Sequence, residues 1–295
     1  MTRPVTEPSE ASEAAGLALR RLAARPAVAA AVAQAREACT ALRWHPGLRR
    51  RGEPARAEAT VRAARASAAL AGARWPVALL REAVAGARPY PADAAGATVQ
   101  GAVRCLAQAQ RLENSYATTV SQTLAALHLA AAGGLLPAGQ LGRPRAAGEP
   151  PGDGGELLDA TGAVLPAPDG AALTDRLRAL AVLLAAPADV PALVVAALAQ
   201  AEVATIRPFA AGNGVVARAL CRTVVVARGL DPTGVAVWEA GLLAAGPALP
   251  QALAGYATGD PEGVDRWLTV FAAAVVEGAA EGGRVAEAVL AGRTG

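Results

Sequence analysis

The chain has 295 residues and a formal net charge of +3, which comes from 28 arginines, no lysine and 25 acidic residues. Its hydrophobic content is 53% but its aromatic content only 3%, so a buried core must consist mainly of Ala, Leu and Val. The near balance of charge, with a short basic run at Arg49–Arg51 that has no aromatic neighbour suited to stacking, argues against a nucleic-acid partner. Because alanine and leucine favour helices, the expected fold class is all-α.

Cysteines and histidines are few and indicate neither a disulfide nor a metal site. Cys39, Cys105 and Cys221 are odd in number and far apart, so we expect buried thiols in a reducing compartment. Neither His45 nor His128 has an acidic residue four positions later, and no metal ligand set is predicted. With no apolar signal segment at the N-terminus and no uninterrupted apolar run of about 20 residues, we expect a soluble, cytoplasmic protein without a membrane partner.

The first half of the chain is predicted to be helical after a short tail. Residues 1–12 are polar and are expected to form a disordered tail. Pro26 marks a start or a break within the first helical region, and Trp44–Gly47 has the composition of a turn. The helices predicted from apolar periodicity and from Gly and Pro boundaries cover about 13–41, 54–72, 75–84, 93–113 and 115–132.

One segment, 137–170, lacks a helical pattern. Its Arg143–Gly155 part is rich in Gly and Pro and is expected to be a flexible loop. The following Glu156–Pro166 is expected to hold a short β-hairpin that turns at Asp159–Gly162. Helices are predicted to resume over about 171–186, 190–205, 213–228, 234–244, 247–256 and 261–291.

The most informative stretch is Thr205–Arg218, which holds the chain's only Ile, one of its two Phe and one of its two Asn. It has the pattern of a helix end, a tight Gly-Asn-Gly turn and a new helix. Glycines let backbone N–H groups approach a phosphate, and the helix N-terminus adds partial positive charge. We therefore predict a nucleotide- or phosphate-binding site at Gly212, Asn213, Gly214 and Arg218.

The same stretch resembles the signature loop of the Fic (Fido) family, His-Pro-Phe-x-Asp/Glu-Gly-Asn-Gly-Arg-x-x-Arg. In this family the histidine removes a proton from a target hydroxyl, which attacks ATP so that AMP is transferred. The acid of the loop holds Mg²⁺, and its arginines hold phosphates. The positions that agree with the pattern are Pro208, Phe209, Gly212, Asn213, Gly214 and Arg218.

Three positions depart from the family pattern. Arg207 stands at the position of the catalytic histidine and is not expected to act as a base, because a guanidinium stays protonated. Ala211 replaces the acidic residue, so the resemblance does not extend to a Mg²⁺ ligand. Val215 replaces the first arginine. The Pro, Phe, Gly and Asn residues that shape the loop match the family pattern, whereas its catalytic histidine, its acidic metal ligand and its first arginine are replaced.

The resemblance also implies an arrangement of the whole chain. Residues 115–295 would form a Fic-like helical domain with a small β-hairpin flap, and residues 13–114 would be an N-terminal helical extension. The two helices before the loop and the trailing helices after it follow the order of the Fic fold. A protein target would dock at the flap, residues 156–170.

A second resemblance concerns the inhibitory helix of Fic proteins, whose pattern is Ser/Thr-x-x-x-Glu-Gly/Asn. Its glutamate pairs with the second arginine of the loop, which is Arg218 here. Ser67 and Gly72 match the pattern, with Ala71 in place of the glutamate. The segment 109–114 is the alternative, because it keeps Glu-Asn but lacks the serine.

These observations lead to three functional hypotheses. The first is a degenerate Fic-domain protein, a pseudoenzyme that is silent or weakened in AMP transfer (AMPylation) and retains binding of ATP or another nucleotide. The second is an active nucleotidyltransferase of the protein adenylyltransferase type, with altered chemistry, that moves AMP or another phosphate-linked group to a protein hydroxyl. The third is a helical interaction module. The sequence does not name a target, a nucleotide base or an oligomeric state.

Overall fold

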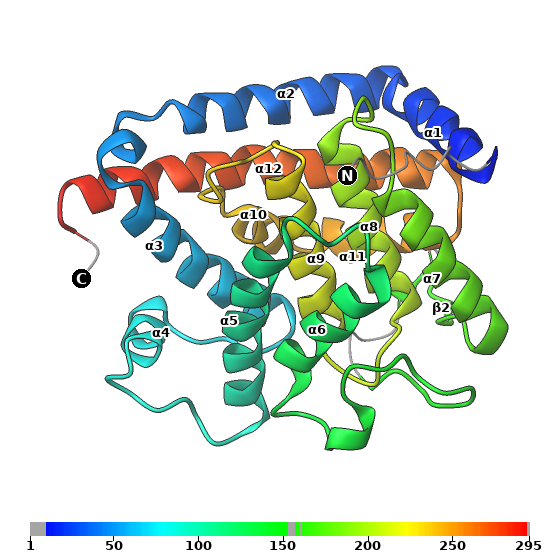
Figure 1. The fold of residues 1–295 in the computed structure, drawn as a ribbon, viewed down its shortest axis with the longest axis horizontal. Helices are drawn as coiled ribbons and strands as arrows, with labels where there is room; N and C mark the ends of the chain where they lie inside the picture. The colour runs from blue at the N-terminus through cyan, green and yellow to red at the C-terminus, as the bar shows by residue number, and fades with distance from the viewer. Residues whose placement is uncertain (1–9, 153–156, 160, 294–295) are drawn as a thin grey trace, which may run out of the picture.

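The computed structural model describes residues 10–152, 157–159 and 161–293, and this part of the chain is mainly helical, with one small β-hairpin (Figure 1). An all-α fold with a small hairpin was predicted and is confirmed. The helices are α1 (Glu10–Ala23), α2 (Pro26–Arg43), α3 (Pro46–Leu70), α4 (Val77–Val84), α5 (Ala94–Leu112), α6 (Val120–Ala132), α7 (Gly170–Leu184), α8 (Ala192–Ile206), α9 (Asn213–Ala227), α10 (Trp238–Ala244), α11 (Ala248–Ala257) and α12 (Pro261–Leu290), with one 3₁₀ turn at Ala138–Gln140.

Several boundaries differ from the predicted ones for local reasons. α1 begins at Glu10, inside the expected 1–12 tail, and residues 1–9 lie outside the described residues. α3 begins at Pro46 rather than near Pro54, because His45 Nδ1 accepts a hydrogen bond from the Gly47 amide at 3.2 Å and caps the helix. The helix is kinked at Arg51, three residues before Pro54, where the backbone is not helical.

The expected helix 115–132 is shorter at its start. Residues 113–119 form turns, and α6 begins only at Val120. Thr118 donates its hydroxyl hydrogen to the Ser115 carbonyl at 2.9 Å. Such local bonds from hydroxyl side chains compete with the helical backbone pattern, which explains the delayed start.

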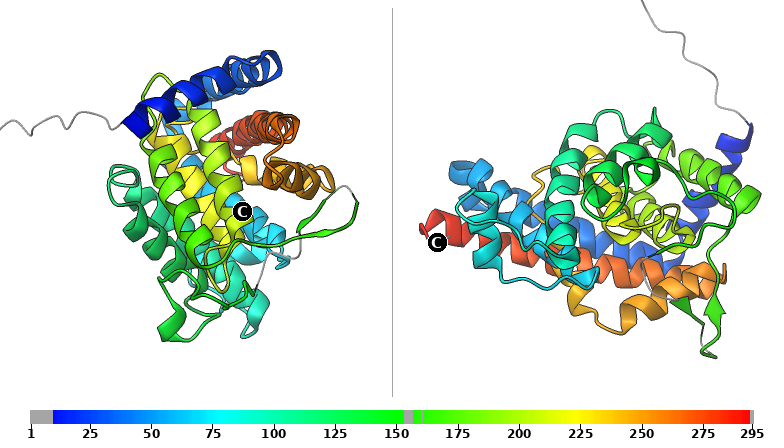
Figure 2. Two further views of the ribbon diagram at one scale, coloured as in Figure 1. Left: turned by 90° about the vertical axis from the view of Figure 1, so that its right-hand side faces the viewer. Right: turned by 90° about the horizontal axis from the view of Figure 1, so that it is seen from below.

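The predicted hairpin is present and projects from the helical body (Figure 2). β1 (Leu157–Leu158) pairs antiparallel with β2 (Val164–Leu165), and Leu158 lies opposite Val164. Asp159 Oδ1 accepts hydrogen bonds from the amides of Thr161 at 2.8 Å and Ala163 at 2.9 Å, which fixes the turn. The bonds from the Thr161 hydroxyl and from these amides hold the pKa of the Asp159 carboxyl below its usual value.

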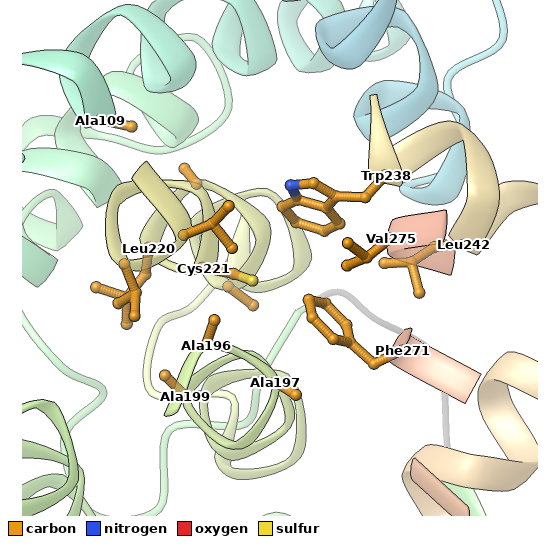
Figure 3. Packing of buried hydrophobic residues seen from close by; sticks show 14 of the residues in the cluster. Ala109, Ala196, Ala197, Ala199, Leu220, Cys221, Trp238, Leu242, Phe271 and Val275 are labelled. Atoms are coloured by element: carbon orange, nitrogen blue, oxygen red, sulfur yellow. The ribbon is translucent and has the colours of Figure 1, made fainter. Parts of the chain in front are cut away.

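The centre of the molecule is the pair α8 and α9, which pack side by side. Almost every residue of α8 is buried, and small side chains such as Ala196 and Ala199 face Leu220 and Cys221 of α9 (Figure 3). Alanines on α8 let the two helices approach closely, so the alanine-rich composition serves the core.

Aromatic side chains connect this central pair to the long helix α12. Trp267 donates its indole N–H to the Ala197 carbonyl of α8 at 2.8 Å. The rings of Trp238 and Phe271 pack with their centroids 5.5 Å apart (Figure 3), and the centroid of the Trp267 ring lies 5.9 Å from that of Phe271. A Cβ at Gly278 would lie 2.4 Å from the Trp238 backbone, so only glycine permits this crossing of α10 and α12.

The N-terminal helices belong to the same packed body. α2 lies along α12 over much of its length, and α3 contacts α5, α9, α10 and α12 (Figure 1). One hydrophobic cluster continues from α2 and α3 into α8 and α9. The division of the chain at residue 114 therefore stays an interpretation drawn from the family resemblance. No helix in the described part has the length and apolar character needed to cross a bilayer.

The three cysteines are buried and not in disulfides, as the sequence predicted. Burial raises the pKa of the Cys39 and Cys105 thiols to about 12. Burial likewise raises the pKa of the Cys221 thiol far above its usual value. The thiols are therefore protonated at neutral pH.

An ionic network joins α3, α4 and α12. The Glu58 carboxylate, itself buried, accepts hydrogen bonds from Arg81 at 2.6 and 2.8 Å and from Arg62 at 2.7 Å. Arg62 also donates to Glu281 of α12 at 2.6 Å. Burial alone would raise the pKa of Glu58, but the bonds from Arg81 and Arg62 outweigh it and lower that pKa.

We expect Glu58→Gln to lower the unfolding free energy by about 1.5–3 kcal/mol at pH 7, since it removes charge-assisted hydrogen bonds. A lowered folded-state pKa means that this contribution is present above about pH 4.5 and is lost as the pH falls through the folded-state value. Urea unfolding from pH 7 to pH 3 should show a shallower acid loss for the variant. Glu277→Gln, in an exposed pair with Arg284, is the control. Parallel pH profiles for wild type and Glu58→Gln would contradict this role of Glu58.

Candidate anion-binding site

The turn between α8 and α9 covers residues 207–212, where the sequence placed it. Arg207 is the C-cap residue that follows α8. Its backbone is left-handed with φ 45° and ψ 65°, and its amide donates to the Val203 carbonyl at 3.1 Å. Arg207 is the only residue other than glycine with positive φ in the described part of the chain. Such a conformation costs a non-glycine residue about 1–2 kcal/mol and needs support from its surroundings.

The side chain of Asn213 holds the turn in shape. Its Oδ1 accepts a hydrogen bond from the Phe209 amide, and its Nδ2 donates to the Phe209 carbonyl, both at 2.8 Å. Gly212, with φ 78°, occupies the N-cap position of α9. Asn213 is therefore the first helical residue and bonds the loop backbone, whereas Gly212 makes the sharp change of direction.

Phe209 anchors the turn to α6. Its ring stacks on the imidazole of His128, with centroids 4.0 Å apart and an angle of 11° between the planes. His128 is fully buried, and its Nδ1 accepts a hydrogen bond from the Gly142 amide at 3.0 Å. This contact was not predictable from the sequence, because His128 and Phe209 are far apart in the chain.

Arg145 is a structural residue that the sequence did not reveal. Its buried guanidinium donates to the carbonyls of Arg207 at 2.7 Å and Ile206 at 3.3 Å, which end α8. It also donates to the carbonyls of Glu149 and Pro168, both at 2.8 Å. A cation at the carbonyl end of a helix satisfies orphan acceptors and opposes the helix dipole.

The backbone around Arg145 also pairs with the turn. The Arg145 amide donates to the Pro208 carbonyl, and the Gly152 amide to the Ala210 carbonyl, both at 2.7 Å. A Cβ at Gly152 would lie 2.5 Å from the Ala210 oxygen, so glycine is required for this approach. These contacts fix residues 145–152, which composition had predicted to be flexible, and residues 153–156 lie outside the described residues.

Arg218 lies one turn into α9, where it is buried. Its Nε donates to Ser67 Oγ at 2.9 Å and its Nη2 to the Ser67 carbonyl at 2.7 Å. A Cβ at Gly214 would lie 3.2 Å from Nη1, so the guanidinium is close to the first turn of α9. These two bonds to Ser67 hold the guanidinium in position.

The structure therefore brings one of the two candidate inhibitory segments to Arg218. Ser67 lies on α3, and Ala71 follows it by four residues at the exposed end of that helix, before Gly72. In the alternative segment, 109–114, the glutamate at position 113 pairs with Arg56 at 2.9 Å.

No family model and no curated protein matches the chain. Solved structures do match it. A Fic family protein from Desulfovibrio desulfuricans G20 superimposes with a TM-score of 0.69 at 20% identity, over 87% of this chain and 74% of that one. A fragment of Fic-1 from C. elegans gives 0.55 at 18% identity, over 93% and 78%. The chain has a Fic-like fold.

Within the Fic-like fold, the three departures from the signature pattern differ in their surroundings. Arg207 is buried, and Ala211 is half-buried on the turn. Val215 is 4% exposed and belongs to the hydrophobic cluster. Position 215 is thus an apolar core position in this chain.

The residues at the turn fit a phosphate better than a metal ion. Ala211 offers no side-chain oxygen, and the described residues contain no group of three His, Cys, Asp or Glu that could hold a metal. The first turn of α9, with Gly212 at its N-cap and Gly214 beside Arg218, retains the elements that bind anions.

We expect Arg145→Ala to lower the unfolding free energy by about 1.5–3 kcal/mol, because buried carbonyls of the turn lose a charged donor. Arg143→Ala is the matched control on the same segment. Arg143 is exposed, and its ion pair with Glu149 contributes about 0.2–1 kcal/mol. Urea unfolding of both variants tests the difference, and equal losses would refute the capping role of Arg145.

Proposed function

We propose that this chain is a Fic-fold pseudoenzyme that binds a nucleotide or phosphate at the α8–α9 turn without transferring AMP. One observation carries the proposal. The Arg218 guanidinium lies against the first turn of α9, beside Gly214, and is held there by two hydrogen bonds to Ser67. A preplaced cation and a helix N-terminus at one point form an anion site.

The same geometry argues against transfer chemistry. A general base contributes about 10²–10⁴-fold to a reaction rate, and the guanidinium of Arg207 stays protonated. Ala211 supplies no ligand for the Mg²⁺ that would neutralise phosphate charge. Phosphate binding by α9 and Arg218 requires neither a general base nor a Mg²⁺ ligand. We therefore expect this chain to bind phosphates without transferring AMP.

The hairpin is the proposed docking site for a protein target. Leu158 and Val164 lie opposite each other on the two strands, and each side chain is about half exposed. An exposed apolar pair at the tip of a projecting hairpin can pack against an extended segment of a partner. An active transferase with altered chemistry could use the same docking site. Turnover measurements distinguish that hypothesis from the pseudoenzyme.

Isothermal titration with ATP, ADP and inorganic phosphate, without Mg²⁺, tests the binding proposal. We expect Arg218→Ala to weaken binding about 10- to 150-fold, the range for one charged hydrogen-bonding group. Arg178→Ala, an exposed arginine on α7, is the control and should bind as wild type does. No binding to wild type would favour the interaction module, and equal binding to Arg218→Ala would place the anion elsewhere.

We expect the wild-type chain to transfer no labelled AMP to itself or to proteins of a lysate. The double variant Arg207→His with Ala211→Asp should make ATP affinity dependent on Mg²⁺, because it returns an oxygen ligand and a base. Adding Val215→Arg should destabilise the fold, since that site is an apolar core position. A robust Mg²⁺-dependent signal from wild type would instead establish the transferase with altered chemistry.

A further inference from the structure

Trp44 lies at the corner between α2 and α3 and is the most exposed large hydrophobic residue in the described part of the chain, at 60%. Trp238 and Trp267, by contrast, are fully buried. The guanidinium carbon of Arg43 lies 5.6 Å from the centroid of the Trp44 ring, and that of Arg49 lies 6.0 Å from it. An exposed indole flanked by two arginines is a distinct surface feature.

The basic run Arg49–Arg51 has an aromatic neighbour in the folded chain. From the sequence we predicted no aromatic neighbour suited to stacking beside that run, and a turn at Trp44–Gly47. α3 begins at Pro46, and its first turn brings Arg49 back to the Trp44 ring. The basic run is therefore part of a surface that contains an aromatic side chain.

Hollows surround Trp44 on this surface. One, of about 550 Å³, is lined by Trp44, Leu48, Pro232 and Val235 together with arginines. Another, of about 510 Å³, lies against Trp44 and the Ala33–Ala41 part of α2. These two hollows, with Trp44 and its flanking arginines, are called the Trp44 surface below.

A third hollow extends the surface along α2. It has a volume of about 730 Å³ and shares Arg36 and Thr40 with the second hollow and Arg43 with the first. Val32, Arg36, Thr40 and Arg43 recur every three or four residues, so they occupy one face of α2. At 1.5 Å per residue, this face is about 16 Å long.

Charge on the Trp44 surface is predominantly positive. Arg36, Arg43 and Arg49 are exposed, and none of the ion pairs among the described residues involves them. Glu37 and Glu53 contribute one acid to each of the two hollows beside Trp44. The surface thus combines arginine cations with two isolated acids and apolar walls.

We propose that the Trp44 surface docks an acidic polypeptide segment that carries an apolar anchor residue. An arginine stacked on an indole presents the N–H groups at its edge outward, where a carboxylate binds in bidentate geometry. The hollows beside the ring accept an aliphatic side chain of the partner. Tryptophan and arginine are the residue types that dominate binding energy at protein interfaces.

The two acids decide between a polypeptide and a nucleic acid. A single strand of nucleic acid carries a negative charge at every phosphate, so Glu37 and Glu53 would repel it in both hollows. A polypeptide places carboxylates only at chosen positions and an apolar residue between them. The surface therefore fits an acidic peptide better than a polyphosphate chain.

A fluorescein-labelled twelve-residue peptide of Glu and Leu tests this proposal by fluorescence anisotropy with the full chain. We expect saturable binding that weakens with added salt, because exposed charges are screened. Trp44→Ala should weaken binding by at least about thirtyfold, and Trp44→Phe by less, because it keeps an aromatic ring. Arg43→Glu with Arg49→Glu should abolish binding, whereas Arg178→Glu, a charge reversal of an exposed arginine on α7, should leave it unchanged.

Two controls separate a loss of binding from a loss of folding, and a peptide ligand from a nucleic acid. Thermal unfolding of each variant shows that the exposed substitutions leave the fold intact, so a loss of binding reports on the surface. A labelled twelve-residue oligothymidylate is the second probe. No binding of the peptide to wild type, equal loss in Arg178→Glu, or tighter and Trp44-dependent binding of the oligonucleotide would each overturn the proposal.

Discussion

The two hydrogen bonds between the Asn213 side chain and the Phe209 backbone close the turn on which the rest of the site depends. They set the direction in which α9 leaves the turn and hold Phe209 where its ring meets His128 of α6. Arg145 then satisfies the carbonyls at the end of α8. The turn is thus fixed by contacts that need neither a catalytic base nor a metal.

Much of the fold follows from local sequence signals. Pro26, Pro46 and Pro261 each stand in the first turn of a helix, where proline loses no hydrogen bond. The run Asp159–Gly162 carries its own turn chemistry, and the hairpin forms around it. Boundaries were wrong where a side chain altered the backbone locally, as His45 does by capping α3 and Thr118 by bonding the Ser115 carbonyl.

Only those parts of the candidate site whose residues lie close together in the sequence could be predicted from it. The 207–212 turn and Arg218 lie within one short stretch of the sequence, and the composition of that stretch and its family resemblance predicted them directly. The contacts of Arg145 with Arg207 and of His128 with Phe209 join residues far apart in the chain, and no spacing rule reveals them. The burial of Val215 likewise depends on the packing of distant helices, so the sequence alone did not identify this position as part of the core.

The buried thiols have a practical consequence. Since burial keeps Cys39, Cys105 and Cys221 protonated at neutral pH, alkylating reagents that react with thiolates have no accessible target among them. A cysteine introduced on the projecting hairpin, for example by Thr161→Cys, would carry a spectroscopic label selectively. With a second cysteine introduced on an exposed helix, distances between the hairpin and the helical body could be measured without prior removal of the chain's own cysteines.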